Sequence, residues 1–274
     1  MLNRDLIISP FLKWAGGKRW LIHQCIDIFP KQNEYNVYYE PFLGSAAVFF
    51  HLKPFHAVLS DINAELIDTY KTIKSSRSAV VSLLKNHHNL HSKEHYYHVR
   101  SALYSNDVEK AARFIYLNRT CWNGLYRVNN SGGFNVPIGT KTKVILDNDN
   151  FEAVAKLLEN AIILKMDFEE AMQQAQKNDF IFVDPPYTVK HNSNAFVQYN
   201  ETLFSWADQV RLRDSVESAV SRGVKVLVTN ANHSSIRELY DGLGDMICLS
   251  RASVLASNPE KRGKYEELAI KCGY

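Results

Sequence analysis

Residues 180–187 read FIFVDPPY, and this stretch predicts both the fold and the position of a ligand pocket. Its first half is a continuous apolar run, typical of a parallel strand that is buried on both faces. Its second half places the carboxylate of Asp184, two prolines and the ring of Tyr187 at the carboxyl end of that strand. Because open α/β sheets bind their ligands at this end of their strands, we expect an α/β protein with a polar pocket at Asp184.

The two prolines limit what this pocket can recognise. Pro185 and Pro186 fix two φ angles and remove two N–H donors, so the turn presents carbonyl oxygens and few amides. A carboxylate and a free carbonyl can accept both hydrogens of an exocyclic amine, and a tyrosine can stack on the ring that carries it. The alternative is an ordinary strand-to-loop turn, since Asp-Pro commonly opens turns.

Size and composition are those of an ordinary globular protein. The 274 residues can bury one large core, or one core with a small subdomain. Hydrophobic residues make up 46% of the chain, no apolar run reaches membrane-span length, and no signal-peptide core is present. The four cysteines are far apart and form no metal-type pair, so we expect reduced thiols in a cytoplasmic protein that contacts no membrane.

Alternating strands and helices flank a central region of different texture. Residues from about 75 to 118 look helical and polar, and residues 118–143 are rich in turns. The string NNSGG at 129–133 is a strong hairpin signal. We therefore expect an α/β sheet that is interrupted by an insertion. The expected strands are 37–40, 57–60, 162–166, 180–183 and 224–228, with a terminal hairpin at 247–249 and 267–271.

The insertion carries an uneven charge. Residues 112–144 contain five basic side chains and no Asp or Glu, although the net charge of the whole chain is only +3. Aromatic residues and glycines are interleaved with these basic residues. A basic, acid-free stretch with aromatics is typical of a nucleic-acid contact. The alternative is a solvated basic hairpin that has no partner.

A loop at an earlier strand end indicates a nucleoside ligand. Residues 40–44 (EPFLG) follow the first strand, and Asp61 ends the next strand, at a spacing from Glu40 that suits contact with ribose hydroxyls. Spacing alone does not exclude NAD, although the loop has one glycine where the dinucleotide fingerprint has three. Gly16, Gly17 and Lys18 open a helix in a way that suits a carboxylate. A nucleoside with a free amino-acid carboxylate describes S-adenosylmethionine.

Short motifs follow one another in order along the chain: FLKWAGGK (11–18), YEPFLGSA (39–46), LSDIN (59–63), LNRTCWNGLYRVN (117–129), GGFNVPIG (132–139), MDFEEA (166–171) and VDPPY (183–187), with WADQVRLRD (206–214) as a later match. In this order they resemble the motifs of the Dam-type DNA N6-adenine methyltransferases. The resemblance implies a Rossmann-like, S-adenosylmethionine-dependent methyltransferase sheet with a terminal β-hairpin and an inserted helical and hairpin target-recognition domain. It places the catalytic domain in residues 1–70 and 145–274, and the DNA target-recognition domain in residues 71–144.

Matching positions imply roles for individual residues. Asp167 and Phe168 match the residues that hold the cofactor's adenine. Trp122 and Asn123 match positions that enter the duplex beside a flipped base, and Leu125, Arg127 and Pro137 match base-reading positions. The implied catalytic residues are Asp184, Pro185 and Tyr187. The expected cofactor contacts are Trp14, Lys18, Glu40, Phe42, Gly44, Asp61, Asp167, Phe168 and Asp184. The expected DNA contacts are Lys13, Arg119, Trp122, Asn123, Leu125, Arg127, Asn135, Pro137 and Lys141.

The resemblance therefore predicts a site-specific, adenine-specific DNA methyltransferase. Its substrate is an adenine flipped out of double-stranded DNA, in GATC or another site containing GAT, and we expect a monomer or a weak dimer. Five histidines lie close together in the insertion, but the chemistry needs no metal and we expect none. The setting of the enzyme, in a restriction-modification system, a phage or a housekeeping pathway, stays open.

Two positions depart from the family pattern, and two alternative functions stay open. Ala46 stands where the cofactor loop usually has a second glycine, and Thr140 stands where a basic residue often follows the hairpin. Lys141 can substitute for the missing basic residue. One alternative is a methyltransferase acting on RNA or on a protein glutamine, whose pockets commonly begin with Asn in place of Asp184. The other is a DNA-binding protein that retains the fold without catalysis.

Overall fold

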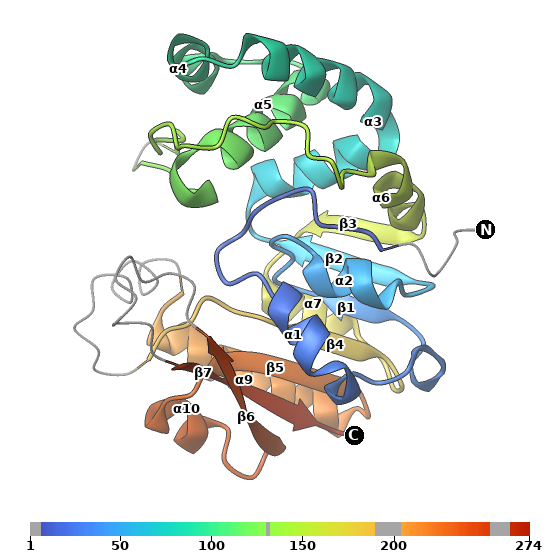
Figure 1. The fold of residues 1–274 in the computed structure, drawn as a ribbon. Helices are drawn as coiled ribbons and strands as arrows, with labels where there is room; N and C mark the ends of the chain where they lie inside the picture. The colour runs from blue at the N-terminus through green and yellow to red at the C-terminus, as the bar shows by residue number, and fades with distance from the viewer. Residues whose placement is uncertain (1–6, 130–131, 190–203, 253–263) are drawn as a thin grey trace. The chain divides into compact units, whose positions relative to one another are not determined.

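The computed structural model describes residues 7–129, 132–189, 204–252 and 264–274. It confirms the α/β class, because the strands of the described residues form one seven-stranded sheet in the order β3-β2-β1-β4-β5-β7-β6. The spatial order differs from the chain order, as crossover connections between parallel strands require. The strands are β1 Tyr38–Glu40, β2 Ala57–Asp61, β3 Ala161–Lys165, β4 Phe180–Val183, β5 Lys225–Ala231, β6 Asp245–Ala252 and β7 Lys264–Cys272 (Figure 1).

The chain packs as two compact units, each assembled from several segments. The first unit contains residues 1–19, 43–55 and 61–165. The second unit contains residues 20–42, 56–60 and 166–274. The domain boundaries predicted at residues 70 and 144 mark where the inserted segment begins and ends along the chain. They remain a prediction.

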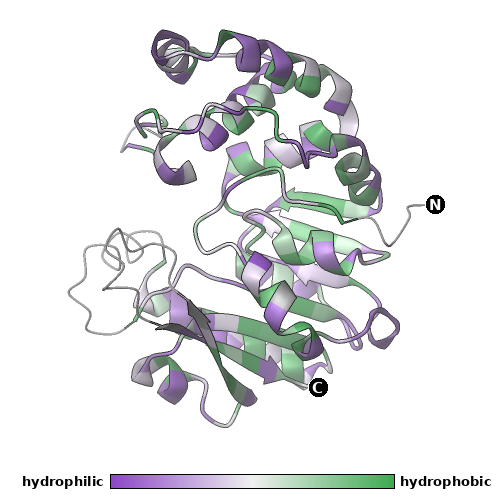
Figure 2. Ribbon diagram, viewed as in Figure 1, coloured by the Kyte–Doolittle hydropathy of each residue, from purple (hydrophilic) through white to green (hydrophobic). Residues whose placement is uncertain are grey.

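The predicted central strand is β4, in the second unit. All four of its residues are buried, and it pairs in parallel with β1 on one side and with β5 on the other. Because successive side chains of a strand point to opposite faces, a strand that is apolar throughout must be covered on both faces. Figure 2 shows the hydrophobic stretches along the strands of this sheet in green.

The predicted terminal hairpin is also present, as an antiparallel pair of β6 and β7 beside β5. Its register pairs Ile247 with Ala269, and β7 in turn pairs Ile270 with Val228 of β5. Both strands are longer than the sequence predicts. This hairpin brings Glu267 of β7 to the same sheet as β4, which matters for the site described below.

Helices α7 (Phe168–Gln174) and α9 (Trp206–Ser221) of the second unit pack against each other on one face of the sheet (Figure 1). The sequence predicts Ser205 as a helix cap, and the start of α9 confirms it: the Oγ of Ser205 accepts from the N–H of Asp208 at 3.2 Å, and Asp208 accepts from the N–H of Ser205 at 2.9 Å. Such a reciprocal pair satisfies two helix-end donors. The helices of this unit are α1 Arg19–Gln24, whose first residue belongs to the other unit, α7 Phe168–Gln174, α9 Trp206–Ser221 and α10 Ser234–Leu239, with short 3₁₀ turns η1 Ile26–Ile28 and η2 Gln32–Glu34.

The sequence predicts a single helix over residues 17–29, and this prediction is wrong in its extent. The chain leaves the helical conformation at Cys25, where φ is −138° and ψ is 42°. A 3₁₀ turn follows, and Phe29 is extended, with φ −87° and ψ 142°. Pro30 favours this extended conformation in Phe29, the residue before it, but it does not account for the earlier end of the helix at Gln24.

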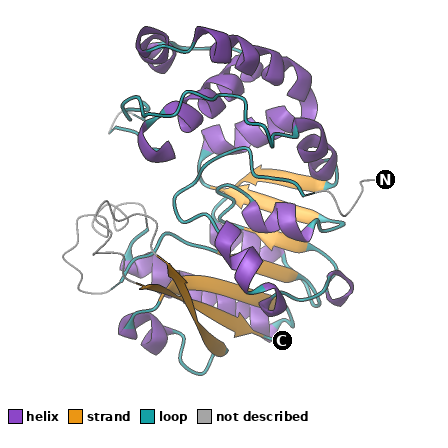
Figure 3. Ribbon diagram, in the orientation of Figure 1, coloured by secondary structure: helices purple, strands orange, loops and turns teal. Residues whose placement is uncertain are grey.

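The first unit is mostly helical, as the texture of the insertion predicts (Figure 3). The sequence predicts Asn63 as a helix cap, and it caps α3 (Ala64–Leu90) by accepting from the N–H of Leu66 at 3.1 Å. The predicted boundary at residue 70 falls inside α3, and Ser76 of the same helix departs from the helical conformation, with φ −139°. The helices are α2 Ala47–Leu52, α3 Ala64–Leu90, α4 Lys93–Ser101, α5 Asp107–Thr120 and α6 Phe151–Leu158, with the 3₁₀ turn η3 Trp122–Gly124.

The predicted recognition hairpin appears as two antiparallel bridges, Cys121 with Ile138 and Val128 with Phe134. The N–H of Asn129 donates to the carbonyl of Gly133 at 2.9 Å, which closes the loop between the two arms. Residues 130 and 131, at the predicted turn itself, lie outside the described part of the chain.

Candidate active site and DNA interface

Asp184 directly follows β4, as predicted, and its side chain is half-buried. The hydroxyl of Thr229 donates to Asp184 Oδ1 at 2.8 Å. Thr229 is buried on β5, one residue beyond the pairing of Val183 with Val228. The parallel register therefore places a donor beside the carboxylate and fixes its orientation.

Tyr187 is held by a residue that the sequence did not indicate. Its hydroxyl donates to Glu267 Oε2 at 2.7 Å, and Glu267 is buried on β7. Burial raises the pKa of Tyr187 well above its usual value, and the carboxylates of Asp184 and Glu267 add to this effect. The phenol therefore stays neutral, and its ring has a fixed direction. The carbonyl of Pro186 accepts from Gln209 Nε2 at 3.4 Å, while Pro185 is buried.

The end of β1 lies beside the end of β4, because the two strands pair in parallel. Glu40, the last residue of β1, is buried and accepts from the hydroxyl of Tyr38 at 2.7 Å. Burial raises the pKa of Tyr38 well above its usual value, with the neighbouring carboxylate of Glu40 as a second cause. Two residues further on, Phe42 is half-buried and stacks on Phe168 with 5.4 Å between ring centroids.

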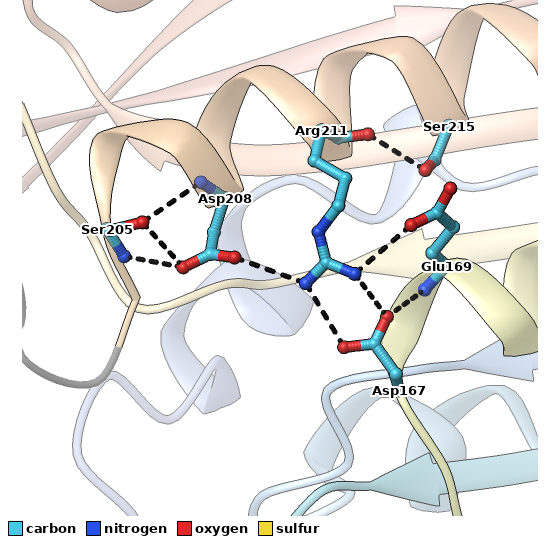
Figure 4. Close-up of polar contacts among 6 residues, drawn as sticks. All are labelled: Asp167, Glu169, Ser205, Asp208, Arg211 and Ser215. Carbon is cyan, nitrogen blue, oxygen red and sulfur yellow. Dashed lines mark hydrogen bonds and ion pairs between the residues drawn. The ribbon is translucent and has the colours of Figure 1, made fainter.

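Asp167 and Phe168 lie at the start of α7. Asp167 caps this helix by accepting from the N–H of Glu169 at 3.0 Å, and Phe168 is buried. The carboxylate of Asp167 also accepts two hydrogen bonds from Arg211 of α9 (Figure 4). The sequence did not indicate Arg211 as a site residue. The only signal was the position of Arg211 inside the matching string 206–214.

In the first unit, Trp14, Gly44 and Asp61 lie close together. The N–H of Gly44 donates to Asp61 Oδ2 at 3.3 Å, and a Cβ on Gly44 would lie 2.8 Å from Trp14 Cδ1. The indole of Trp14 stacks on Tyr126, with 5.5 Å between centroids, so packing occupies part of its surface. Burial raises the pKa of Asp61, although hydrogen bonds from the backbone of Asn63 and Gly44 lower it.

Lys18 is buried in the same unit, and its ammonium donates to the carbonyl of Gly16 at 2.7 Å. Gly16 has a φ of 78°, a conformation that residues with a Cβ rarely adopt. The glycine loop therefore curls around the lysine head group. This arrangement keeps a positive charge within the loop that the sequence assigns to the cofactor.

Ala46, which stands where the cofactor loop usually has a second glycine, adopts a backbone conformation that favours glycine. It adopts the left-handed conformation, with φ 53° and ψ 32°, immediately before α2. This conformation costs a residue with a Cβ about 1–2 kcal/mol, whereas glycine loses about 0.5–1 kcal/mol more chain entropy on folding.

We expect the substitution Ala46→Gly to raise the free energy of unfolding by up to about 1 kcal/mol, because it relieves this strain. Urea denaturation measures the change. The matched control is Ala47→Gly, inside α2, which should lower the free energy of unfolding. A loss of stability in both variants would contradict the expectation.

The base-reading positions of the hairpin arms are accessible. Trp122 is 51% exposed and Leu125 is 38% exposed, and Pro137 is exposed on the opposite arm. Arg127 is also exposed, and its Nε donates to Asn135 Oδ1 at 2.8 Å across the two arms. The hairpin therefore presents an aromatic ring, apolar surface and a guanidinium that is partly pre-oriented.

Lys13 is tied to this region by a side chain of α5. The N–H of Lys13 donates to Asn118 Oδ1 and its carbonyl accepts from Asn118 Nδ2, both at 2.8 Å. Burial lowers the pKa of Lys13. Asn123 and Lys141, the other expected DNA contacts of this unit, are exposed.

Arg119, which the sequence predicts to contact DNA, is instead buried within the first unit. Its side chain is 1% exposed, and its guanidinium donates to both carboxylate oxygens of Asp149, at 2.5 and 2.7 Å. It also donates to the carbonyls of Phe11 and Val144. Since these contacts use its donors inside the unit, we leave Arg119 out of the DNA contacts proposed below.

The histidines of the insertion contact one another and Tyr116. His87 Nδ1 lies 2.9 Å from His95 Nε2, and burial lowers the pKa of His87 to about 4. His91 Nδ1 lies 2.9 Å from the hydroxyl of Tyr116. Among the described residues, no group of three or more His, Cys, Asp or Glu side chains is placed to hold a metal ion. In the same part of the chain, no helix is both long enough and apolar enough to cross a membrane.

This sheet, with an acid, two prolines and a tyrosine after its central strand, defines the class of α/β methyltransferases. The family model for the D12 class N6 adenine-specific DNA methyltransferases matches residues 14–253. The chain belongs to this family. It is therefore an adenine-specific DNA methyltransferase, as the motifs predict.

Relatives cover nearly the whole chain. A type II methyltransferase of Lactococcus lactis subsp. cremoris is 38% identical over 280 residues, covering 98% of each chain. A type II methyltransferase of Methanocaldococcus jannaschii is 34% identical and covers 96% of this chain and 98% of its own. A DNA adenine methylase of Haemophilus influenzae is 32% identical and covers 97% of this chain and 94% of its own.

Proposed function

We propose that the protein transfers a methyl group from S-adenosylmethionine to N6 of an adenine flipped out of a short duplex site, with GATC as the target. The observation that carries this proposal is the pair of fixed side chains after β4. Thr229 orients Asp184, and Glu267 orients Tyr187. Both anchors are buried in the second unit, so the turn is organised before any substrate arrives.

The turn recognises an exocyclic amine by its acceptors. In the proposed complex, the Asp184 carboxylate accepts one N6 hydrogen, the Pro185 carbonyl accepts the other, and the ring of Tyr187 stacks on the purine. These contacts draw the delocalised lone pair of N6 out of the ring plane. Fixed dipoles and proximity then supply most of the acceleration. No covalent enzyme intermediate is needed, so we assign no nucleophilic role to the cysteines.

The cofactor residues of the second unit suit an adenosyl group. Phe42 and Phe168 provide stacked aromatic surface, while Asp167 provides an acceptor for an adenine amine. We assign Glu40 to the same group, and Trp14, Lys18, Gly44 and Asp61 of the first unit to the remainder of the cofactor. S-adenosylmethionine supplies an electrophilic methyl group on a positively charged sulfur.

Base flipping explains the exposed aromatic residue of the hairpin. A stacked adenine cannot reach the turn, and extruding it costs a few kcal/mol. Stacking of the flipped base on Tyr187 offsets roughly 1–3 kcal/mol of this cost. Trp122 is exposed next to Asn123, so it is available to fill the vacated space. We assign the remaining recognition to Lys13, Leu125, Arg127, Asn135, Pro137 and Lys141 within the proposed recognition domain, residues 71–144.

A methylation-protection assay tests the proposal. Duplexes containing GATC or its single-base variants are incubated with labelled S-adenosylmethionine and then digested with a nuclease that methylation at GATC blocks. We expect label only in the GATC duplexes, and protection of those duplexes from the nuclease; the single-base variants, which the nuclease does not cut, are compared by label alone. Label in RNA or protein instead, or no label in any substrate, would refute the proposal.

We expect the substitution Arg127→Ala to relax sequence choice, because a bidentate arginine contact to a guanine edge is worth about 1–3 kcal/mol of discrimination. Initial rates on GATC and on duplexes with the guanine replaced measure this change. Lys141→Ala is the matched control, since loss of a phosphate contact weakens binding to all duplexes alike. An unchanged rate ratio in the Arg127 variant would argue against its role in base reading.

A further inference from the structure

We infer that Arg211 is a positioning residue for the adenine end of the cofactor site. This inference rests on the proposed function, in which Asp167 and Phe168 hold the cofactor's adenine. Arg211 lies on α9, and the close-up in Figure 4 shows its guanidinium among the carboxylates of Asp167, Glu169 and Asp208.

The contact with Asp167 is bidentate. Arg211 Nη1 donates to Asp167 Oδ1 at 2.8 Å, and Nη2 donates to Oδ2 at 3.2 Å. A planar guanidinium with two parallel bonds fixes both the direction and the rotation of a carboxylate. These bonds raise the pKa of Arg211, since its charged form binds Asp167. Asp167 therefore presents its oxygens in one orientation beside a permanent positive charge.

Two further carboxylates hold the guanidinium in place. Arg211 Nη1 donates to Glu169 Oε2 at 3.1 Å, and Nη2 donates to Asp208 Oδ1 at 3.1 Å. Asp208 is itself held by both the N–H and the hydroxyl of Ser205, at 2.9 and 2.7 Å. Hydrogen bonds thus connect Ser205, at the start of α9, through Asp208 and Arg211 to Asp167. The first turns of one helix therefore orient the Asp167 carboxylate.

The same guanidinium packs on the aromatic ring that is assigned to the adenine. The central carbon of Arg211 lies 4.2 Å from the centroid of the Phe168 ring. Phe168 in turn stacks on Phe42. One side chain therefore contacts both residues of the adenine site without needing to touch the cofactor itself. A purine amine would be recognised by the Asp167 carboxylate, whereas a purine with a carbonyl at that position would face two acceptors and be rejected.

Calorimetric titration with S-adenosylhomocysteine and S-inosylhomocysteine tests this role, because the second ligand has a carbonyl in place of the amine. We expect the wild-type protein to prefer the adenosyl ligand. In Arg211→Met, its Kd should rise about tenfold, the factor of one hydrogen bond to a charged group. The Kd of the inosyl ligand should rise less, so the preference should shrink.

The controls separate positioning from general support of the fold. Arg213→Met is matched, since Arg213 lies on the same helix but pairs with Asp214 and Glu217, and it should leave both affinities unchanged. Arg211→Lys keeps the charge without the bidentate geometry and should lose part of the preference; if Arg211→Met does not fold, this variant decides the question. Asp167→Asn combined with Arg211→Met should lose less than the sum of the two single losses.

The outcomes distinguish this inference from the proposed function. If the wild-type protein binds neither ligand, the proposed cofactor is wrong. If it prefers the adenosyl ligand and Arg211→Met keeps the full preference, or loses affinity for both ligands equally, Arg211 does not position Asp167.

Discussion

Replacing Asp184 by Ala is expected to lower the rate of methyl transfer by about 10²- to 10³-fold, the range for loss of one preorganised electrostatic group. The substitution removes the acceptor that orients the amine, and it leaves the hydroxyl of Thr229 only its longer hydrogen bond, to the carbonyl of Val183 at 3.3 Å. DNA affinity should change little, because Asp184 lies in the second unit and the proposed base-reading residues lie in the first. Single-turnover transfer of a labelled methyl group and fluorescence anisotropy with duplex DNA measure the two effects.

Two further variants show whether the carboxylate itself is needed. Asp184→Asn keeps an acceptor oxygen of similar position and should retain more activity than Asp184→Ala. Thr229→Val leaves the carboxylate in place but removes its orienting hydrogen bond, and a smaller loss of rate is expected. Simultaneous loss of transfer and of DNA binding in Asp184→Ala would argue against a catalytic role, provided that its melting temperature is unchanged.

Replacing Arg119 by Met is expected to destabilise the protein by about 3–5 kcal/mol, the range for breaking a buried ion pair by removing one partner. The variant leaves the Asp149 carboxylate, which is 9% exposed, without its two charged hydrogen bonds. It also leaves the carbonyls of Phe11 and Val144 without their donor. Urea denaturation measures the loss of stability.

An exposed arginine of the same segment, Arg127, provides the control for this prediction. Arg127→Ala removes an exposed guanidinium from the same basic stretch and should leave stability nearly unchanged. Asp149→Ala should reproduce most of the loss seen for Arg119→Met, because it breaks the same pair from the other side. An Arg119→Met protein with wild-type stability and weakened DNA binding would restore Arg119 as a DNA contact.

Arg119 also shows where reasoning from the sequence alone loses accuracy. A basic residue in an acid-free stretch looks like a surface charge, and its partner Asp149 lies 30 residues further along the chain. Nothing local in the sequence distinguishes Arg119 from Arg127, yet one is 1% exposed and the other is exposed. Exposure depends on which segments pack above a side chain, and periodicity within one helix does not report it.

The ends of the helices also show which features a local sequence signal can predict. The capping signals at Asn63 and Ser205 predicted the starts of α3 and α9 correctly, because a cap is a contact between neighbours in the chain. The early end of α1 at Cys25 was missed, since no residue beside it breaks a helix. A contact can be predicted from the sequence when its two residues are close together in the chain.

The sequence by itself determined the central strand, the acid at its carboxyl end and the enzyme family, because the apolar run and each of the family's motifs are complete within a few residues. Only the tertiary structure decided which side chains hold the site residues in place. Glu267 reaches Tyr187 across 80 residues of chain, and Arg211 reaches Asp167 across 44. Such contacts arise from strand register and helix packing, which depend on many residues at once, so no single stretch of the chain encodes them.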